Sequence, residues 1–282
     1  MIVFVGPGAT ARRATAPPGG VGRGGGRRGP AALRRGVASL GHAAADLAFG
    51  NACAGCGEHP GLLCAGCRAA LLGPASRIRT VPGRPDLPLA GAAGYDGAVR
   101  AAIIEHKERG RLPLAGPLGD ALAVAVTALL AAGGGCRGPA HAGAAPGGPV
   151  HGDRPVHGDR PVVLIPVPSA PSAVRHRGHD PVLRSARRAA ATLHRSGQRA
   201  TVAAGLRHGR RVADQAGLDR REREHNLHGS LVATRAATRH GDGCCVVVVD
   251  DIVTTGATLR ESVRALEAAG LRPCGAAVVA VV

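Results

Sequence analysis

Apolar residues in the C-terminal half of the chain fall into two kinds of run. Short runs rich in β-branched residues cover 162–167, 246–249 and 276–282, and stretches with helical spacing cover 181–195 and 258–269. Continuous apolar strands that alternate with helices are typical of a parallel sheet covered on both faces. The pattern therefore predicts an α/β domain.

The chain before this domain is less regular. Apolar residues with helical spacing predict two helices, over 98–107 and 115–132. A tract of Gly, Pro, Arg and Ala fills residues 1–40, and nothing in its pattern could be buried, so we expect disorder there.

Changes in composition divide the chain into five parts. These are a basic Gly/Pro/Arg tail at 1–50, a Cys-rich module at 51–75, a connector with two helices at 76–135, a linker with a tandem Val-His-Gly-Asp-Arg-Pro copy at 136–161, and the α/β core at 162–282.

The charge balance is strongly basic. The formal net charge is +17, and Lys107 is the single lysine among the 36 basic residues. Such a balance favours anionic partners, either phosphorylated small molecules or nucleic acid, although a solvated basic surface would look the same. With one Tyr, two Phe and no Trp, the chain has almost no aromatic platform for stacking single-stranded bases.

Signals for export or membrane insertion are weak. The N-terminus lacks the compact apolar segment of a secretory signal. The longest helical candidate without breakers, Ala121 to Ala132, is too short to span a membrane. We therefore expect a cytoplasmic, reducing location, where cysteines serve as metal ligands or core residues more often than as disulfides.

Four cysteines have the spacing of a zinc site. Cys53-x-x-Cys56 and Cys64-x-x-Cys67 are two short pairs, each able to hold one tetrahedral metal from a tight turn. We expect Gly55 and Gly66 to permit these turns. Four thiolates in a small module without its own core predict structural Zn²⁺, with a redox pair as the alternative. The other four cysteines lack this spacing, and we expect core or linker roles for them.

The sharpest chemical signal follows the second apolar strand. Residues 246–249 deliver Asp250 and Asp251 to the carboxyl end of a strand, where open α/β sheets bind ligands. Two adjacent carboxylates there can accept hydrogen bonds from the vicinal hydroxyls of a ribose.

A turn of small residues comes next and opens a helix. Thr258 and Glu261 have the spacing of a capping box. The backbone N–H groups and hydroxyls at such a helix start can hold a phosphate, and Gly256 lets the backbone approach it closely. The Walker A alternative requires a lysine after its second glycine, and none is present there.

Residues 246–258 resemble the phosphoribosyl-pyrophosphate motif of type I phosphoribosyltransferases. Residues 51–282 as a whole resemble the ComF branch, competence-associated proteins that include the ComFC and GntX groups. The pre-core segment around Tyr95 and Lys107 and a Gln-x-x-Leu…Arg-x-x-Asn stretch from 215 to 226 agree with this resemblance. One segment departs from it: the family has Arg-Gly-Phe-Asn-Gln where this chain has His179-Asp180-Pro181 after Arg-Gly.

The resemblance implies roles for individual residues. Asp250 and Asp251 would be the catalytic carboxylates, and the Cys₄ element would hold zinc. The substrate-binding residues would be Thr254, Thr255, Gly256, Ala257 and Thr258 at the 5′-phosphate, Arg175 and Arg177 at the pyrophosphate, and Lys107 at a phosphate. Arg175, Arg177 and Lys107 also fit a second interpretation, as plain surface residues. The segment 215–226 would close over the substrate, or would simply be a solvated basic face.

The resemblance also implies an activity. Phosphoribosyl pyrophosphate bound with Mg²⁺ would transfer its phosphoribosyl group to an acceptor that the sequence does not name, with a link to competence and DNA uptake. Two alternatives remain: a competence protein that binds ribose phosphate or DNA without turnover, and a nucleic-acid-binding zinc module with the second domain as scaffold. The sequence gives no oligomeric state.

Overall fold

The computed structural model describes residues 52–73, 77–133, 160–209 and 228–282. The chain divides into two units, residues 1–49 and 50–282, and every described residue belongs to the second. The expected disordered tail, the tandem copy in the linker and the stretch 215–226 lie outside the described residues, so these expectations stay predictions.

A six-stranded sheet forms the centre of the unit, with strand order β1-β2-β8-β7-β3-β4. All neighbours are parallel except β1, which pairs antiparallel with β2. The strands are β1 (Arg77–Val81), β2 (Arg84–Gly94), β3 (Val162–Pro166), β4 (Ala200–Val202), β7 (Cys245–Val253) and β8 (Gly275–Val281). A separate two-stranded sheet pairs β5 (Leu206–His208) with β6 (Leu231–Ala233).

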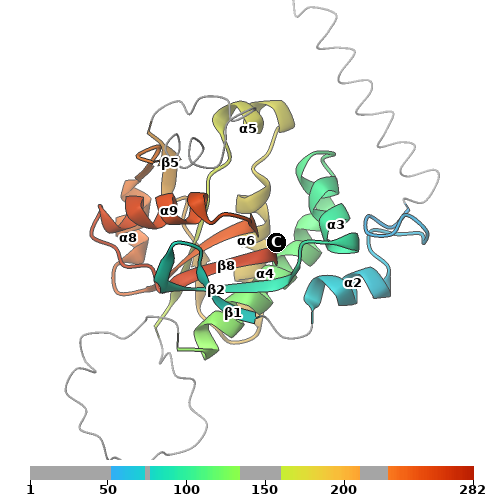
Figure 1. Ribbon diagram of the computed structural model, residues 1–282, viewed down its shortest axis with the longest axis horizontal. Helices are drawn as coiled ribbons and strands as arrows, with labels where there is room; N and C mark the ends of the chain where they lie inside the picture. The colour runs from blue at the N-terminus through green and yellow to red at the C-terminus, as the bar shows by residue number, and fades with distance from the viewer. Residues whose placement is uncertain (1–51, 74–76, 134–159, 210–227) are drawn as a thin grey trace, which may run out of the picture. The chain divides into compact units, whose positions relative to one another are not determined.

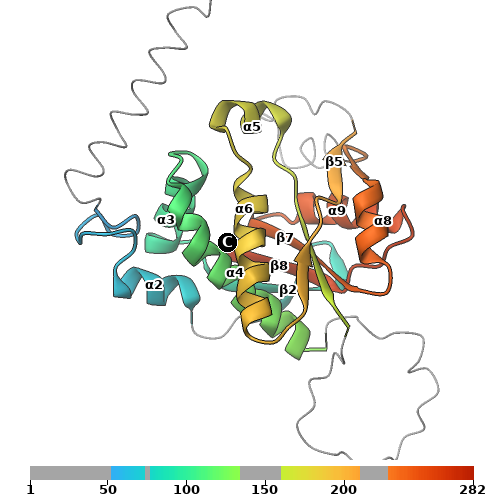
Figure 2. The same cartoon turned by 180° about the vertical axis from the view of Figure 1, so that it is seen from behind.

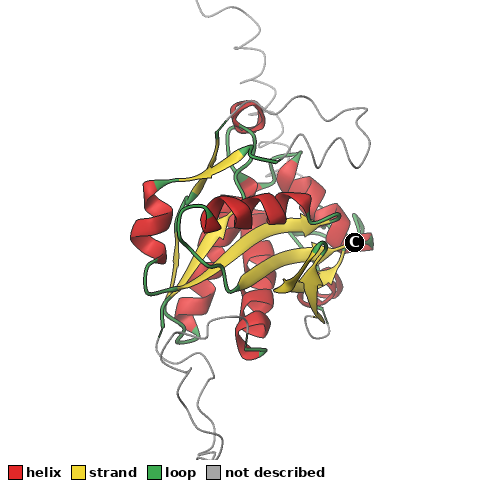
Figure 3. Ribbon diagram, turned by 60° about the vertical axis from the view of Figure 1, so that its left-hand side comes forward, coloured by secondary structure: helices red, strands yellow, loops and turns green. Residues whose placement is uncertain are grey.

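Helices cover both faces of the six-stranded sheet. Figures 1 and 2 show α9 and α8 over one face and α4 and α6 over the other, and Figure 3 shows the resulting layers. The helices are α2 (Ala65–Leu72), α3 (Gly97–Lys107), the 3₁₀ turn η1 (Leu112–Leu114), α4 (Ala115–Ala131), α5 (Pro171–Arg177), α6 (Pro181–Arg195), α8 (Arg235–Gly241) and α9 (Ala257–Glu267). The α/β prediction and the four predicted helices are confirmed.

The valine run of β7 shows why its sequence does not alternate. Val247 and Val249 pack into the core cluster shared with α4 and α6, whereas Val246 and Val248 pack into the cluster shared with α9. Successive side chains of a strand point to opposite faces, so a strand buried on both sides must be apolar throughout. Cys245 and Cys274 are buried in the same core, as expected for cysteines outside the zinc spacing.

The main core helix is longer than the sequence indicated. Leu112–Ala131 forms a helical stretch of 20 residues with mean hydropathy 1.8, long and apolar enough to cross a membrane by length and composition alone. The helix predicted over 115–132 is confirmed as α4, and η1 extends it back to Leu112 because Pro113 and Pro117 are tolerated in the first turns of a helix. The expectation that the longest apolar helical candidate is too short to span a membrane was wrong. Since 67% of the apolar stretch is buried inside the protein, it has the character of a core helix.

Candidate functional site

The two acidic residues lie where the sheet ends. β7 continues past its valines to Val253, because Asp250 and Ile252 still pair with Val278 and Ala280 of β8. The side-chain oxygen Oδ1 of Asp250 accepts a hydrogen bond from the N–H of Asp251 at 2.8 Å. Burial and the neighbouring charge of Asp251 raise the pKa of Asp250 well above its usual range, and Lys107 opposes this shift. The site therefore concentrates negative charge that needs a cation or a hydrogen-bond donor.

Lys107 supplies that positive charge. It is the last residue of α3, and its Nζ donates to Oδ2 of Asp251 at 2.8 Å. Burial alone would lower the pKa of Lys107, but the charge and hydrogen bond of Asp251 outweigh it and the net shift is upward. The lysine is thus held in its charged form beside the carboxylates. The contact observed for it is with Asp251, and its expected contact with a phosphate stays a prediction.

The turn after β7 has the shape of a phosphate cradle. Gly256 has φ of 71° and is the N-cap of α9, so the N-cap has no side chain, and the first turn has no acidic residue. Oγ1 of the preceding Thr255 accepts from the N–H of Ala257 at 3.4 Å. A Cβ on Gly256 would lie 3.0 Å from Cδ of Pro82, so both conformation and space require glycine. Thr254 is exposed and Thr258 half-buried. These features leave α9 with a positive N-terminal dipole near the two acids.

The predicted capping box is wrong. α9 begins at Ala257, so Glu261 lies beyond the position from which it could cap the first turn. Its carboxylate instead accepts from the N–H of Leu231 at 2.9 Å and from Nε of Arg264 at 2.7 Å. Glu261 is buried, with 4% exposure, and it joins the middle of α9 to β6.

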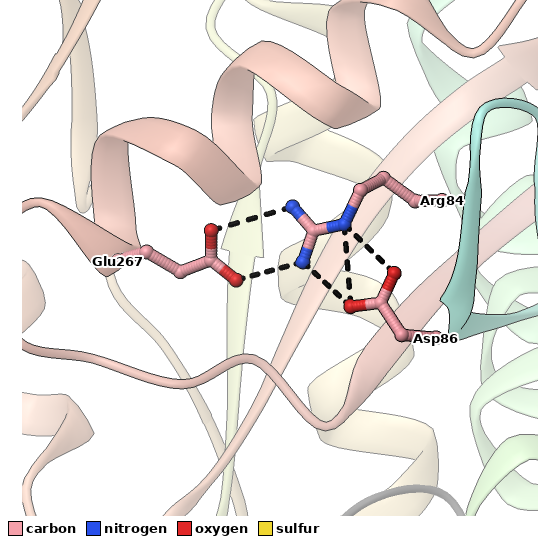
Figure 4. Close-up of polar contacts among 3 residues, drawn as sticks. All are labelled: Arg84, Asp86 and Glu267. Carbon is pink, nitrogen blue, oxygen red and sulfur yellow. Dashed lines mark hydrogen bonds and ion pairs between the residues drawn. The ribbon is translucent and has the colours of Figure 1, made fainter.

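Two sets of contacts join the β1–β2 hairpin to α9, and no pattern in the sequence predicted them. Nη1 of Arg260 donates to the carbonyl oxygens of Pro82 at 2.6 Å and Thr255 at 2.8 Å. At the other end of α9, Arg84 bonds Glu267 at 2.8 Å and Asp86 at 2.8 Å (Figure 4). These contacts fix the hairpin to α9 at both ends.

The two arginines expected at the pyrophosphate differ in placement. Arg177 lies near Lys107, is 11% exposed in its side chain, and its Nη1 bonds Oε1 of Glu108 at 3.2 Å. Arg175 is exposed on α5, and no hydrogen bond or ion pair joins it to any residue in the described ranges. The structure therefore brings Arg177 to the acidic site and leaves Arg175 outside it.

Residues 179–181, where this chain departs from the family pattern, fit the local structure. His179 is buried, with its ring centroid 5.7 Å from that of His106, so an aromatic ring occupies the position of the family's Phe. Asp180 caps α6 by accepting from the N–H of Leu183 at 3.0 Å, a role in which Asp and Asn are equivalent. Pro181 then takes the first helical position, where proline is favoured.

The four cysteines of the zinc spacing converge. Sγ atoms of Cys53, Cys56, Cys64 and Cys67 all lie within 4.8 Å of one another. Burial alone would raise the pKa of Cys53, but N–H groups that include those of Cys64 and Gly55 lower it to about 6. Burial and the neighbouring cysteines raise the pKa of Cys67. The fit to a tetrahedral metal therefore rests on the convergence of the four sulfur atoms.

The glycines of this cluster behave differently from expectation. A Cβ on Gly55 would lie 2.6 Å from Sγ of Cys67, so glycine is required there. Gly66 lies inside α2 with open space around it, and no tight turn depends on it. Leu71 of the same helix is buried in the main core, and Arg111 donates to the carbonyl oxygen of Ala52 at 3.1 Å. The cluster is thus attached firmly to the α/β unit.

Comparison with known proteins agrees with this geometry. Residues 179–281 match the model of the phosphoribosyl transferase domain. A 56-residue segment is 41% identical to an orotate phosphoribosyltransferase from Methylibium petroleiphilum, over 20% of this chain and 21% of that protein. The chain thus aligns with about a fifth of that relative's length. The segment that matches the phosphoribosyl transferase domain contains Asp250, Asp251 and the turn before α9.

Proposed function

We propose that this chain transfers the phosphoribosyl group of phosphoribosyl pyrophosphate to an acceptor. One observation carries the proposal: two adjacent carboxylates lie near the carboxyl end of β7, shortly before a turn in which Gly256 is the N-cap of α9. This is the arrangement needed for a ligand with vicinal hydroxyls next to a phosphate. It lies inside the segment that matches a phosphoribosyltransferase domain.

Each group has a task in this proposal. Asp250 and Asp251 accept hydrogen bonds from the ribose 2′- and 3′-hydroxyls. In this proposal the 5′-phosphate lies against the turn and is bound by N–H groups at the start of α9 and by threonine hydroxyls, among them that of Thr255, which accepts from the N–H of Ala257 at 3.4 Å. The acceptor nucleophile forms a bond to ribose C1 as the bond from C1 to the pyrophosphate oxygen breaks, and pyrophosphate leaves with the electron pair. Fixed charges around C1 stabilise this transition state.

The residues fit a magnesium ion bound together with the substrate. Mg²⁺ prefers oxygen ligands and is usually held by one or two carboxylates plus substrate phosphates. When bound, it would neutralise charge on the pyrophosphate as that group leaves. Lys107 already neutralises part of the carboxylate charge, and Arg177 adds a further positive charge near it.

The wider assignment is part of the same proposal. Membership of the ComF family, a contribution to DNA uptake and a cytoplasmic location rest on the order of the motifs. A four-cysteine cluster precedes a phosphoribosyltransferase domain, and the thiols of that cluster are free. We assign zinc to the cluster because four thiolates at one point select it over the oxygen-preferring metals.

A second candidate is a protein that binds the ribose phosphate without turnover. It is favoured by the ion pair between Lys107 and Asp251, which satisfies one catalytic carboxylate from within the protein. Both candidates need the same carboxylates and the same turn, and they differ only in pyrophosphate release.

Pyrophosphate release separates them. Purified protein with Mg²⁺ and phosphoribosyl pyrophosphate is incubated with a panel of acceptors: orotate, purine and pyrimidine bases, and small amines. The Asp250→Asn, Asp251→Asn variant is the control. The transferase proposal expects acceptor-dependent release that the variant lacks. Binding without release by any acceptor supports the second candidate, and the absence of any binding contradicts both.

A further inference from the structure

A pocket separate from the acidic site opens beside α6. Its volume is about 660 Å³, and η1, the start of α4 and the first turns of α6 line it. Neither the two carboxylates nor the turn before α9 contributes to its wall. A cavity of this size can hold a ligand of about nucleotide or drug size.

One wall of the pocket is strongly basic. Arg184, Arg187 and Arg188 line it from α6, and residues three and four apart lie on the same side of a helix. All three are exposed, and none forms an ion pair or hydrogen bond with a residue that the structure describes. By contrast, Arg84 and Arg264 are paired with carboxylates, so the three arginines of this wall keep their donors available for a ligand.

The acidic content of the pocket does not offset this charge. Asp180 is the carboxylate among the lining residues. Its two oxygens already accept from the N–H of Leu183 at 3.0 Å and the N–H of Ser169 at 3.1 Å. The pocket therefore presents donors and positive charge that no described acceptor uses.

Part of the lining is apolar. Leu112 and Pro113 contribute to it from η1, and Leu183 contributes from α6. Guanidinium groups match the oxygens of a phosphate in a bidentate fork, and apolar side chains favour a flat carbon skeleton. We propose that this pocket binds a small aromatic or heterocyclic phosphate monoester, with the phosphate on the arginines and the ring against Leu112 and Pro113.

The test uses 1-naphthyl phosphate, because this probe has no ribose hydroxyls for Asp250 and Asp251. Calorimetry with the full chain compares wild type, the Arg184→Gln, Arg187→Gln variant, and a matched control on the far face, Arg235→Gln, Arg239→Gln. Both variants remove two exposed arginines from a helix at similar spacing, so they differ in place and not in net charge.

We expect saturable binding to wild type. The α6 variant should bind at least about tenfold more weakly, since each lost charged hydrogen bond accounts for roughly that factor. The α8 control should bind as wild type does, as should the Asp250→Asn, Asp251→Asn variant. The uncharged 1-naphthol and inorganic phosphate should each bind more weakly than the ester.

Three results would overturn the proposal. The first is the absence of saturable binding of 1-naphthyl phosphate to wild type. The second is an equal loss of affinity in the α6 variant and the α8 control, and the third is loss of binding in the double Asn variant. Equal weakening would show a diffuse basic surface, such as one for nucleic acid, and the last result would place the probe in the ribose site. None of these outcomes depends on phosphoribosyl transfer, so the two proposals can fail separately.

Discussion

Glu261→Gln should destabilise the protein measurably, although the position has no contact with the two carboxylates. The substitution keeps the shape of a buried side chain and removes its charge. In wild type this carboxylate accepts from the N–H of Leu231 at 2.9 Å, and from Nε and Nη2 of Arg264 at 2.7 and 2.9 Å. The glutamine side chain has one acceptor oxygen in place of two and carries no charge. The variant therefore loses one acceptor, and the hydrogen bonds that remain are no longer strengthened by a charge on residue 261.

The size of the effect follows from burial. Hydrogen bonds to a charged group contribute about 1.5–3 kcal/mol each, but Arg264 has a side-chain exposure of 35%, so solvent screens its share. We expect a net loss of about 2 kcal/mol. For a unit of this size, that corresponds to a fall in Tm of about 4–8 °C.

The effect should depend on pH in a defined direction. Burial would raise the pKa of Glu261, but Arg264 and the N–H of Leu231 lower it on balance. A lowered pKa in the folded state contributes stability above the ordinary glutamate pKa, and this stability is lost as the pH falls through the folded value. The Tm difference between wild type and Glu261→Gln should therefore be largest at about pH 7 and become smaller below about pH 4.

Thermal unfolding followed by circular dichroism tests this reasoning. Asp242→Asn is the control, because Asp242 is exposed and forms no ion pair with any described residue; it should leave the Tm nearly unchanged. If Glu261→Gln melts with wild type at neutral pH, or if the difference grows on acidification, the assigned role of this carboxylate is wrong.

Three further predictions concern the surroundings of the site. Lys107→Met should shift the pH midpoint of phosphoribosyl-pyrophosphate binding upward relative to Lys107→Arg, because Asp250 loses the cation that lowers its pKa. Calorimetry over a pH series checks this, and identical pH profiles for the two variants would contradict it. Metal analysis should find about one zinc per chain in wild type and none in the Cys53→Ser, Cys56→Ser variant. A wild-type protein that is equally stable without metal would contradict a structural role for zinc. A double-mutant cycle of Arg84→Met and Glu267→Gln, measured by chemical denaturation, should give a coupling free energy under about 1 kcal/mol, because the Glu267 side chain is 42% exposed and solvent screens the ion pair. A much larger coupling free energy would contradict this.

The sequence was sufficient for the strands that are buried on both faces. The runs 162–167, 246–249 and 276–282 are continuous and apolar, and the structure confirms all three as β3, β7 and β8. β2 was missed because Pro85 and Pro88 interrupt its pattern and proline usually indicates a loop or an edge strand.

The part of the site that the sequence places together is local, and the functional roles of its residues stay predictions. Asp250, Asp251 and the turn to Thr258 are contiguous, so one segment of sequence was enough. The contacts that support this segment join distant residues: Arg84 and Glu267 are 183 positions apart, and no local pattern records such a pairing. The capping-box error has a similar origin, because Glu261 accepts from the N–H of Leu231 on β6, 30 positions away, in addition to pairing with Arg264 of its own helix.

The central claim is that Asp250 and Asp251 bind the ribose hydroxyls of phosphoribosyl pyrophosphate. Calorimetry with this ligand and Mg²⁺ on wild type and on the Asp250→Asn, Asp251→Asn variant tests it most directly, with circular dichroism to confirm that both are folded. Loss of charge-assisted hydrogen bonds should weaken binding by about tenfold or more per site. A ligand held only by the basic surface would bind the variant more tightly, because two negative charges are removed. Equal or tighter binding by the variant would contradict the assignment.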